Sequence, residues 1–353
     1  MNPLSLLYGS VVRARAALYA SGRLRTSRLA SPVISVGNLT FGGTGKTPFV
    51  EHLARRLRFE GFRPAILSRG YGRRSKAPVL VSRGEGPLVG PDEGGDEPVA
   101  LARRLPGVAV AVAPRRAEAA RLATELGCDL FLLDDGFQHL AVRRDANLVL
   151  LDARDPFGKG SLPPAGRLRE PLDAIRRADA IVFTRVERGM PSPEAERTVA
   201  LLCPETPVYH AAIRPDGLRD EAGSPVEARE VSLRRCVAAC GVAEPSSFSD
   251  ALRRLDLAAE ETFVFPDHHR YSDRELTRIR QTADRTGAAF LVTTEKDAVK
   301  LAGRLSLPVV TVHLDVEVHE PAFFPWLLSR IGSPKEGFRL SAVGSQPDRF
   351  PSG

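Results

Sequence analysis

The sequence is poor in cysteine, in aromatic residues and in long apolar runs. It has four cysteines, and only Cys236 and Cys240 stand close together, without a second pair at the spacing of zinc ligands. Nothing in this pattern predicts a disulfide framework, so a reducing, cytoplasmic compartment fits best. No apolar run approaches the ~20 residues that are needed to span a bilayer. The sequence therefore gives no indication of a disulfide-stapled or membrane-spanning protein.

Acidic residues are absent from residues 1–30, which carry five arginines. As a helix, this segment would place its larger apolar side chains on one face: Leu4, Leu7, Tyr8, Val11 and Leu18. Arg15 would lie in the middle of that face and Arg13 on the opposite side. The arginines interrupt any signal-peptide core, and no clean cleavage site is present. The segment is therefore either a basic amphipathic helix at an anionic membrane surface or an ordinary helix packed on the domain.

The composition is that of a globular protein with a basic charge balance. The chain has 353 residues, of which 43% are apolar and 26% charged, and this length suits roughly two domains. The formal net charge of +7 and the pI of about 9.5 favour an anionic partner. A nucleotide, a nucleic acid or an acidic membrane would each fit, although arginine-rich solvated faces alone would give the same balance.

Apolar strands alternate with amphipathic helices over the first 200 residues. Strands are expected over residues 32–37, 64–68, 79–82, 108–113, 129–133, 147–151 and 180–184, with helices over 48–60, 96–105 and 115–126. Such alternation predicts an α/β fold with a doubly wound, mostly parallel sheet. Ligands of such sheets bind beyond the carboxyl ends of the strands, where the polar motifs of this chain stand.

The sequence texture changes near residue 207. Alternating strands over 208–213 and 309–318 flank a smaller α/β unit with strands near 235–239, 261–265 and 290–293. We interpret the flanking strands as a paired linker between two domains. The predicted division is a P-loop domain over residues 1–206, a smaller domain with its linker over 207–318 and a disordered tail over 333–353. The segment over 319–332, with a helix over 323–331, is expected to rejoin the first domain.

The segment from Thr40 to Thr47 is a glycine-rich loop between the first strand and the first helix of the sheet. Backbone N–H groups of its central residues would surround phosphate oxygens of ATP: Gly42, Gly43, Thr44, Gly45 and Lys46. Lys46 would neutralise phosphate charge, and the Thr47 hydroxyl would ligate Mg²⁺. Thr40 replaces the usual first glycine. The strand–loop–helix order nevertheless predicts a P-loop nucleotide site of the P-loop NTPase-like kind.

Two aspartates, Asp134 and Asp135, end the apolar strand over 129–133. Adjacent carboxylates repel each other unless a cation lies between them, so they predict a metal-coordinating site. Gln138 and His139 follow on the next turn and would face the cleft. An Asx turn is the alternative explanation.

Two further acidic motifs allow both structural and functional interpretations. Asp96 begins a helix, where a carboxylate also caps the helix by simple electrostatics. His268 follows Asp267 and could act as a base or a metal ligand, but it belongs to the second domain. It could reach the P-loop only across a cleft between the domains. The long loop over 152–171 adds cations that could hold phosphates.

Taken together, these segments resemble the tetraacyldisaccharide 4'-kinase family of lipid A synthesis over roughly residues 10–300. The matching runs are residues 35–48, 67–72, 95–98, 133–139, 164–171, 267–269 and 294–300, in the same order. The resemblance implies ATP-dependent phosphorylation of the 4'-hydroxyl of a tetraacylated glucosamine disaccharide 1-phosphate, which gives lipid IV-A. It also implies peripheral attachment to the cytoplasmic face of the bacterial inner membrane through the N-terminal helix.

The same resemblance implies a role for each site residue. Asp96 and His268 would be the catalytic pair that takes the proton from the sugar hydroxyl, and Lys46 and Arg169 would contact the transferred phosphate. The implied metal side comprises Thr47, Asp134, Asp135 and Glu170. The implied acceptor side comprises Asn38, Arg69, Gln138 and His139.

Two rival functions find less support in the sequence. A P-loop GTPase would carry Asn/Thr-Lys-x-Asp after a strand, whereas Lys296 and Asp297 are adjacent here. A nucleic-acid-binding protein would need a basic, aromatic-lined surface or a known module, and the sequence has neither. We therefore expect no nucleic-acid partner and no obligate protein partner.

Overall fold

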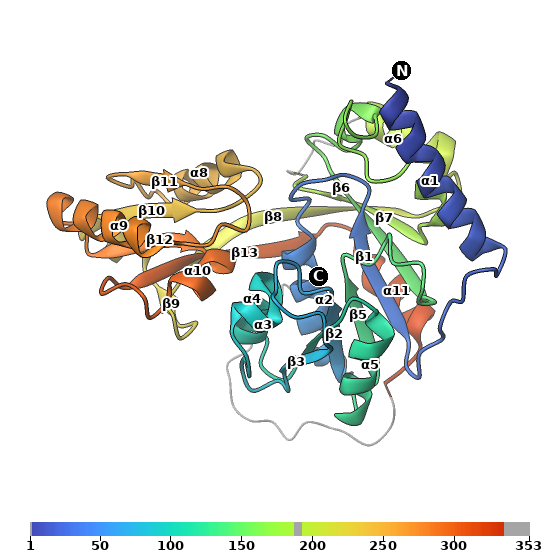
Figure 1. Ribbon diagram of the computed structural model, residues 1–353, viewed down its shortest axis with the longest axis horizontal. Helices are drawn as coiled ribbons and strands as arrows, with labels where there is room; N and C mark the ends of the chain where they lie inside the picture. The colour runs from blue at the N-terminus through green and yellow to red at the C-terminus, as the bar shows by residue number, and fades with distance from the viewer. Residues whose placement is uncertain (1, 187–192, 335–353) are drawn as a thin grey trace.

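The computed structural model describes residues 2–186 and 193–334, where the chain forms two lobes joined by two long strands (Figure 1). The tail predicted to be disordered, over 333–353, lies almost entirely outside the described residues. The larger lobe contains α1 (Pro3–Ala20), β1 (Val33–Asn38), α2 (Lys46–Phe59), β2 (Pro64–Ser68), β3 (Val79–Ser82), α3 (Pro91–Gly94), α4 (Asp96–Arg104), β4 (Ala109–Val112), α5 (Arg116–Glu125), β5 (Leu130–Asp134), β6 (Ala146–Asp152), β7 (Ala180–Thr184), α6 (Pro193–Leu202) and, after the smaller lobe, α11 (Phe323–Ile331).

The smaller lobe follows β7 and α6 in the chain. Its elements are β8 (Val208–Arg219), β9 (Pro225–Val226), α7 (Ala228–Leu233), β10 (Cys236–Cys240), α8 (Pro245–Arg254), β11 (Thr262–Val264), α9 (Asp273–Thr286), β12 (Phe290–Thr294), α10 (Glu295–Leu301) and β13 (Val309–Val318). Short 3-10 turns over Gly158–Gly160 and Leu172–Arg177 lie in the long loop of the larger lobe.

One sheet runs through both lobes in the order β11-β10-β12-β13-β8-β7-β6-β1-β5-β2-β4-β3, with β9 paired to β8. Its pairs are parallel except β13–β8, β8–β9 and β3–β4. In the larger lobe, α2, α4 and α11 pack on one face, whereas α5 and α6 pack on the other. The predicted doubly wound, mostly parallel sheet is therefore confirmed.

The predicted two-stranded linker is formed by β8 and β13, which pair in antiparallel register from Thr311↔Arg219 to Val318↔Ala211. The first residues of β8 also pair with β7, and the first residues of β13 with β12, so each long strand belongs to one lobe at its start. Because the sheet continues through both lobes, the predicted domain boundaries at 206 and 318 stay a prediction.

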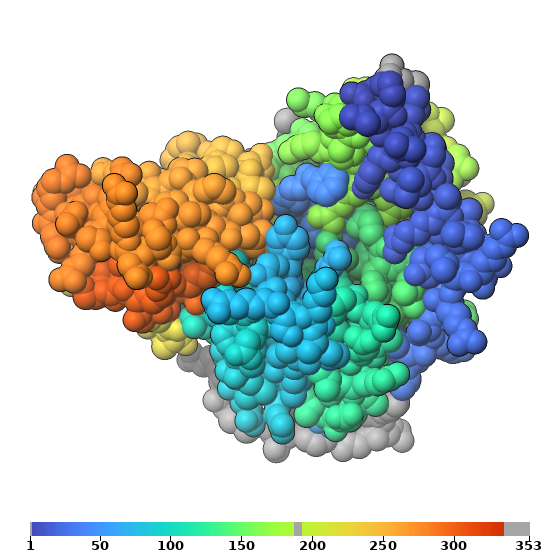
Figure 2. Space-filling model, viewed as in Figure 1, coloured from blue at the N-terminus to red at the C-terminus, as the bar shows by residue number. Residues whose placement is uncertain are grey.

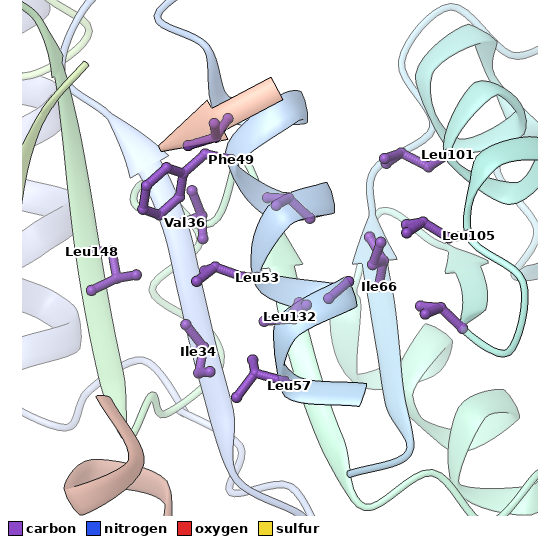
Figure 3. Packing of buried hydrophobic residues seen from close by; sticks show 14 of the residues in the cluster. Ile34, Val36, Phe49, Leu53, Leu57, Ile66, Leu101, Leu105, Leu132 and Leu148 are labelled. Carbon is purple, nitrogen blue, oxygen red and sulfur yellow. The ribbon is translucent and has the colours of Figure 1, made fainter. Parts of the chain in front are cut away.

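The core of the larger lobe explains why the P-loop has a fixed position. The apolar side chains of α2, among them Phe49, Leu53 and Leu57, are fully buried against Ile34 and Leu132 of the central strands (Figure 3). Burial of each such side chain contributes about 1.5–3 kcal/mol. The loop between β1 and α2 is thus held by two elements that cannot move independently.

Helix α1 lies along the side of the larger lobe (Figure 1). Gly9 is its buried residue, because Leu162 of the long loop packs directly on it. The hydroxyls of Ser5 and Tyr8 donate to the carbonyls of Leu162 and Arg169, at 2.9 Å in both cases. The helix is therefore docked on the loop that carries Arg169, and it leaves its opposite face uncovered.

Candidate active site

Side chains of the flanking strands hold the P-loop through hydrogen bonds to Thr40 and Thr44. The Asn38 amide donates to the Thr40 carbonyl at 2.8 Å and to the Thr44 hydroxyl at 3.0 Å. Thr184, at the end of β7, donates to the Thr44 carbonyl at 2.8 Å. These hydrogen bonds hold the Thr40 and Thr44 carbonyls within the protein.

Gly45 is a position of the loop where only glycine fits. Its φ of 80° lies in the left-handed region, and a Cβ there would come within 2.1 Å of Ile213 on β8. The loop therefore passes directly beneath the long strand that joins the lobes.

Two adjacent carboxylates lie beside the P-loop at the end of β5. Asp134 is 2% exposed and accepts a hydrogen bond from Ser68 at 3.1 Å through one oxygen, whereas its Oδ1 is buried without a partner. Asp135 contacts Arg169 at 2.7 Å and Lys46 at 3.7 Å. The group thus joins the P-loop lysine, a buried carboxylate and an arginine of the long loop.

The pKa values of the two carboxylates are shifted in opposite directions. Burial, with the nearby charges of Glu97 and Asp135, raises the pKa of Asp134 to about 7. Burial also opposes ionisation of Asp135, but Lys46 and Arg169 lower the pKa of that carboxyl below its usual value. Asp134 is consequently the carboxylate that gains most from a further positive charge beside it.

The smaller lobe contributes His268, which reaches Asp96 at the start of α4. Nδ1 of His268 lies 3.3 Å from Oδ2 of Asp96, and the imidazole packs on the Tyr71 ring with their centroids 4.9 Å apart. His268 has a φ of 57°, in the left-handed region that residues other than glycine rarely occupy. The structure therefore brings together two residues that are 172 positions apart in sequence.

A cavity of about 1630 Å³ opens between the lobes and is lined by the P-loop, by the two carboxylates at the end of β5 and by His268. In Figure 2 the smaller lobe, in orange, lies against the blue and cyan segments of the larger lobe. The candidate residues that line the cavity are Gly42, Gly43, Thr44, Gly45, Lys46, Thr47, Arg69, Asp134, Asp135, Gln138, His139, Arg169 and His268. Tyr8, Arg15 and Tyr19 of α1 line its other end, so the cavity extends from the P-loop to the N-terminal helix.

Besides Asp96, which contacts His268 but is not part of the cavity lining, two predicted site residues do not line the cavity. Glu170 is 4% exposed and pairs with Arg177 at 2.7 Å, whereas its neighbour Arg169 contacts Asp135. Asn38 is fully buried beneath the P-loop, where its amide binds the loop itself. Neither residue lines the cavity, because the side chains of both point into the protein.

Several residues of the site were not assigned a role from sequence. Glu97 belongs to the matching run over residues 95–98, but no role was predicted for it. It accepts a hydrogen bond from the Thr47 hydroxyl at 3.3 Å. The buried Arg116 donates to the Asp134 carbonyl at 3.3 Å, and Arg185 donates to the Gly43 carbonyl at 2.5 Å. Arginines at strand ends are the only sequence signal for the last two, and such arginines are numerous in this chain.

Comparison with known proteins gives the family of this site. The family model described as LpxK, tetraacyldisaccharide-1-P 4'-kinase, matches residues 1–332. The chain belongs to this family. A tetraacyldisaccharide 4'-kinase of Geobacter sulfurreducens is 44% identical over 322 residues, covering 90% of this chain and 88% of the relative. A relative with the same name from Anaeromyxobacter sp. (strain K) is 46% identical over 298 residues, covering 83% and 78% of the two chains.

A solved structure supports the same assignment. LpxK from Aquifex aeolicus, described as an "apo" form in complex with ATP, is 35% identical, with a TM-score of 0.76 over 93% of this chain and 97% of that chain. The predicted family and the predicted enzyme, a tetraacyldisaccharide 4'-kinase, are thus confirmed. The GTPase alternative finds no support in the structure at Asp297. Its carboxylate is buried and accepts hydrogen bonds from the Gly241 N–H and the Thr294 hydroxyl, so it does not face a ligand.

Proposed function

We propose that this chain transfers the γ-phosphate of ATP to the 4'-hydroxyl of a tetraacyldisaccharide 1-phosphate, which gives lipid IV-A. The observation that carries the proposal is the single cavity that the P-loop lysine, Lys46, and the cross-lobe histidine, His268, both line. Phosphoryl transfer needs in-line positioning and charge neutralisation more than covalent chemistry. Both requirements are met by a cation-lined cavity whose two walls belong to different lobes.

Lys46 and Arg169 would neutralise the charge that spreads over the transferred phosphoryl group. Asp135 contacts both cations and sets their separation. The acceptor hydroxyl is a weak acid and needs a base. Neutral His268, with its Nδ1–H directed at Asp96, would take the hydroxyl proton at Nε2, and the carboxylate would stabilise the imidazolium that forms.

The residues beside the P-loop fit a Mg²⁺ ion. The buried, unpartnered Oδ1 of Asp134 is a hard oxygen ligand of the kind that Mg²⁺ binds, and the Thr47 hydroxyl lies in the same cavity wall. We propose that Asp134, Asp135 and Thr47 hold or orient the ion, without Glu170. When bound, Mg²⁺ would supply positive charge between phosphate oxygens.

Arg69, Gln138 and His139 are proposed to line the acceptor side of the cavity. Burial, together with the charge of Arg116 and other arginines, lowers the pKa of His139 to about 4, so this imidazole is neutral at pH 7. It would serve a sugar or phosphate oxygen as a neutral hydrogen-bonding group. Arg69 supplies a cation at the end of β2, suited to the anionic acceptor.

Helix α1 supports peripheral membrane attachment. Leu4, Leu7 and Val11 are each more than 60% exposed, and no described helix is apolar and long enough to cross a bilayer. An uncovered apolar strip flanked by arginines is typical of a helix that lies in a membrane interface. We propose that α1 holds the enzyme at the anionic cytoplasmic face of the inner membrane, where its amphiphilic acceptor enters the cavity.

The proposal is tested by transfer of labelled γ-phosphate from ATP to a tetraacyldisaccharide 1-phosphate in detergent. The wild-type chain is expected to make a labelled lipid. Lys46→Ala is expected to make none, because the phosphate charge in the P-loop is then no longer neutralised by the lysine. A wild-type chain that hydrolyses ATP without a lipid product would contradict the acceptor.

A further inference from the structure

Lys300 is a buried lysine of α10 that faces the larger lobe. Its side chain is 8% exposed, and its ammonium lies 3.1 Å from Oδ2 of Asp96 and 3.0 Å from Oδ1 of Asp297. It also donates to the carbonyl of His269 at 2.9 Å. Two carboxylate oxygens and one carbonyl oxygen thus surround the ammonium. A buried cation is costly unless it is paired in this way, so the lysine is held in one place.

The same oxygen of Asp96 faces both Lys300 and His268. Oδ2 of Asp96 lies 3.3 Å from Nδ1 of the imidazole and 3.1 Å from the ammonium. Burial raises the pKa of Asp96, but the hydrogen bond from His268 and the charge of Lys300 together bring it below its usual value. The carboxylate is therefore anionic and fixed in direction by partners that both come from the smaller lobe.

Lys300 is itself fixed by a buried anchor within the smaller lobe. The Asp297 carboxylate is fully buried and accepts hydrogen bonds from the Gly241 N–H at 2.8 Å and the Thr294 hydroxyl at 2.7 Å. Asp297 and Lys300 stand one helical turn apart, so the anchor sets where the ammonium points.

We propose that Lys300 is a positioning residue for phosphoryl transfer, which holds the Asp96 carboxylate in its ionised form against Nδ1 of His268. The inference rests on the proposed roles of Asp96 and His268 and adds a residue to them. Because Asp96 belongs to the larger lobe and Lys300 to the smaller one, the contact exists only when the lobes meet. Through Lys300, the ability of His268 to act as a base thus depends on closure of the two lobes.

The other titratable groups near Asp96 do not hold its carboxylate in the ionised form as Lys300 does. Asp267 is paired with Lys296, and its carboxylate lies 4.0 Å from Nε2 of His268. Burial and the negative charge of Asp297 raise the pKa of Tyr271, whose ring lies 5.6 Å from the Lys300 ammonium, so the phenol stays neutral. Within the described residues, Lys300 is the cationic side chain that the structure records against Asp96, beside the imidazole of His268.

The test is Lys300→Met, with steady-state kinetics of lipid phosphorylation across pH. Loss of the ammonium is expected to lower kcat by about 10- to 100-fold, as misplacement of a catalytic group does, while the KM for ATP is unchanged. Removing this positive charge raises the pKa of Asp96, so the acidic limb of the kcat profile should move up by about 1 pH unit. An unchanged kcat and acidic limb would overturn the proposal.

Arg304→Met is the matched control. Arg304 also holds the segment after His269, through the Tyr271 carbonyl at 3.0 Å and Asp273 at 2.9 Å, but it does not contact Asp96. Its loss removes one cation from the same lobe and is expected to leave both kcat and the pH profile as in the wild type.

A double variant, Lys300→Met with Asp297→Asn, separates positioning from simple stability. It removes both buried charges, so no unpaired anion remains at the anchor and folding is protected. If Lys300 only neutralises Asp297, the double variant regains activity, and the proposal fails. If Lys300 positions Asp96, kcat stays low and the acidic limb stays shifted. A wild-type chain without lipid kinase activity would instead defeat the proposed function and leave these profiles unmeasurable.

Discussion

Arg104 of α4 and Glu295 of α10 lie 2.7 Å apart and join the two lobes beneath the cavity. The same guanidinium contacts Glu51 of α2 at 2.7 Å, and the side chains of Arg104 and Glu51 are 14% and 5% exposed. The arginine therefore connects the helix that carries the P-loop lysine to the helix that carries Lys300. This contact is one of those that hold the two lobes together at the candidate site.

Replacement of Arg104 by methionine is expected to destabilise the fold. It removes the cation shared by the buried Glu51 and the half-buried Glu295 and leaves Glu51 with Arg55 alone. Loss of one partner of a buried pair costs up to about 3–5 kcal/mol. Thermal unfolding of the variant should therefore begin at a clearly lower temperature than that of the wild type. Arg74→Met is the control, because the Arg74–Asp92 pair is 70% and 53% exposed and such pairs contribute about 0–1 kcal/mol. Equal melting of both variants would contradict the role given to Arg104.

Much of this site could be predicted from the sequence because parallel strands end at one edge of a sheet. Lys46, Asp134 and Arg69 each follow a predicted strand, so their convergence required only the strand order. The fold class followed from the same alternation. Helix α11 and strand β13 have the predicted bounds, since nothing in their sequences interrupts the apolar pattern.

The rest of the fold and site could not be predicted, because it depends on strand pairing, on the direction of side chains and on the angle between the lobes. Strand β8 was expected to end at Ile213 but continues to Arg219, because pairing with β13 carries it through Pro215 and Gly217. Glu170 adjoins Arg169, yet its side chain points away from the cavity to Arg177. The contact between Lys300 and Asp96 depends on the angle between the lobes, and no local pattern predicts that angle.

His52 on α2 is expected to make the fold sensitive to mild acid. Its Nε2 is buried without a partner between Phe49 and Phe324, and burial, with the charges of Arg56 and Arg55, lowers its pKa from 6.5 to about 4. The unfolded chain binds this proton between those pH values, whereas the folded protein does not. Stability is therefore complete above pH 6.5 and is lost as the pH falls toward 4, by up to about 3 kcal/mol.

The substitution His52→Phe tests this source of acid sensitivity. A phenyl ring fills a similar volume among the same aromatic neighbours and does not titrate. Urea unfolding at pH 7 and pH 5 should show a smaller loss of unfolding free energy in the variant than in the wild type. The other titrating groups, His139 among them, are common to both proteins and cancel in the comparison. An equal loss in both would exclude His52 as the cause.

The exposed strip of α1 is expected to bind anionic vesicles. Leu7→Glu places a charge among Leu4, Val11 and Leu18 and should weaken sedimentation with phosphatidylglycerol vesicles, because apolar area is lost from the interface. Ala17→Glu is the control, since it makes the same charge change on an exposed side of α1 away from this strip. Equal binding by the two variants would show that charge alone, rather than the apolar strip, holds the protein on the vesicle.

The account rests on one active site made by both lobes, and His268→Ala tests it most directly. Transfer of labelled γ-phosphate to the tetraacyldisaccharide 1-phosphate should be measured alongside ATP binding on the same preparation. The account predicts a kcat lower by about 10²- to 10⁴-fold, the contribution of a positioned base, with ATP affinity unchanged, because His268 lies on the opposite wall from the P-loop. Full turnover by His268→Ala would contradict it.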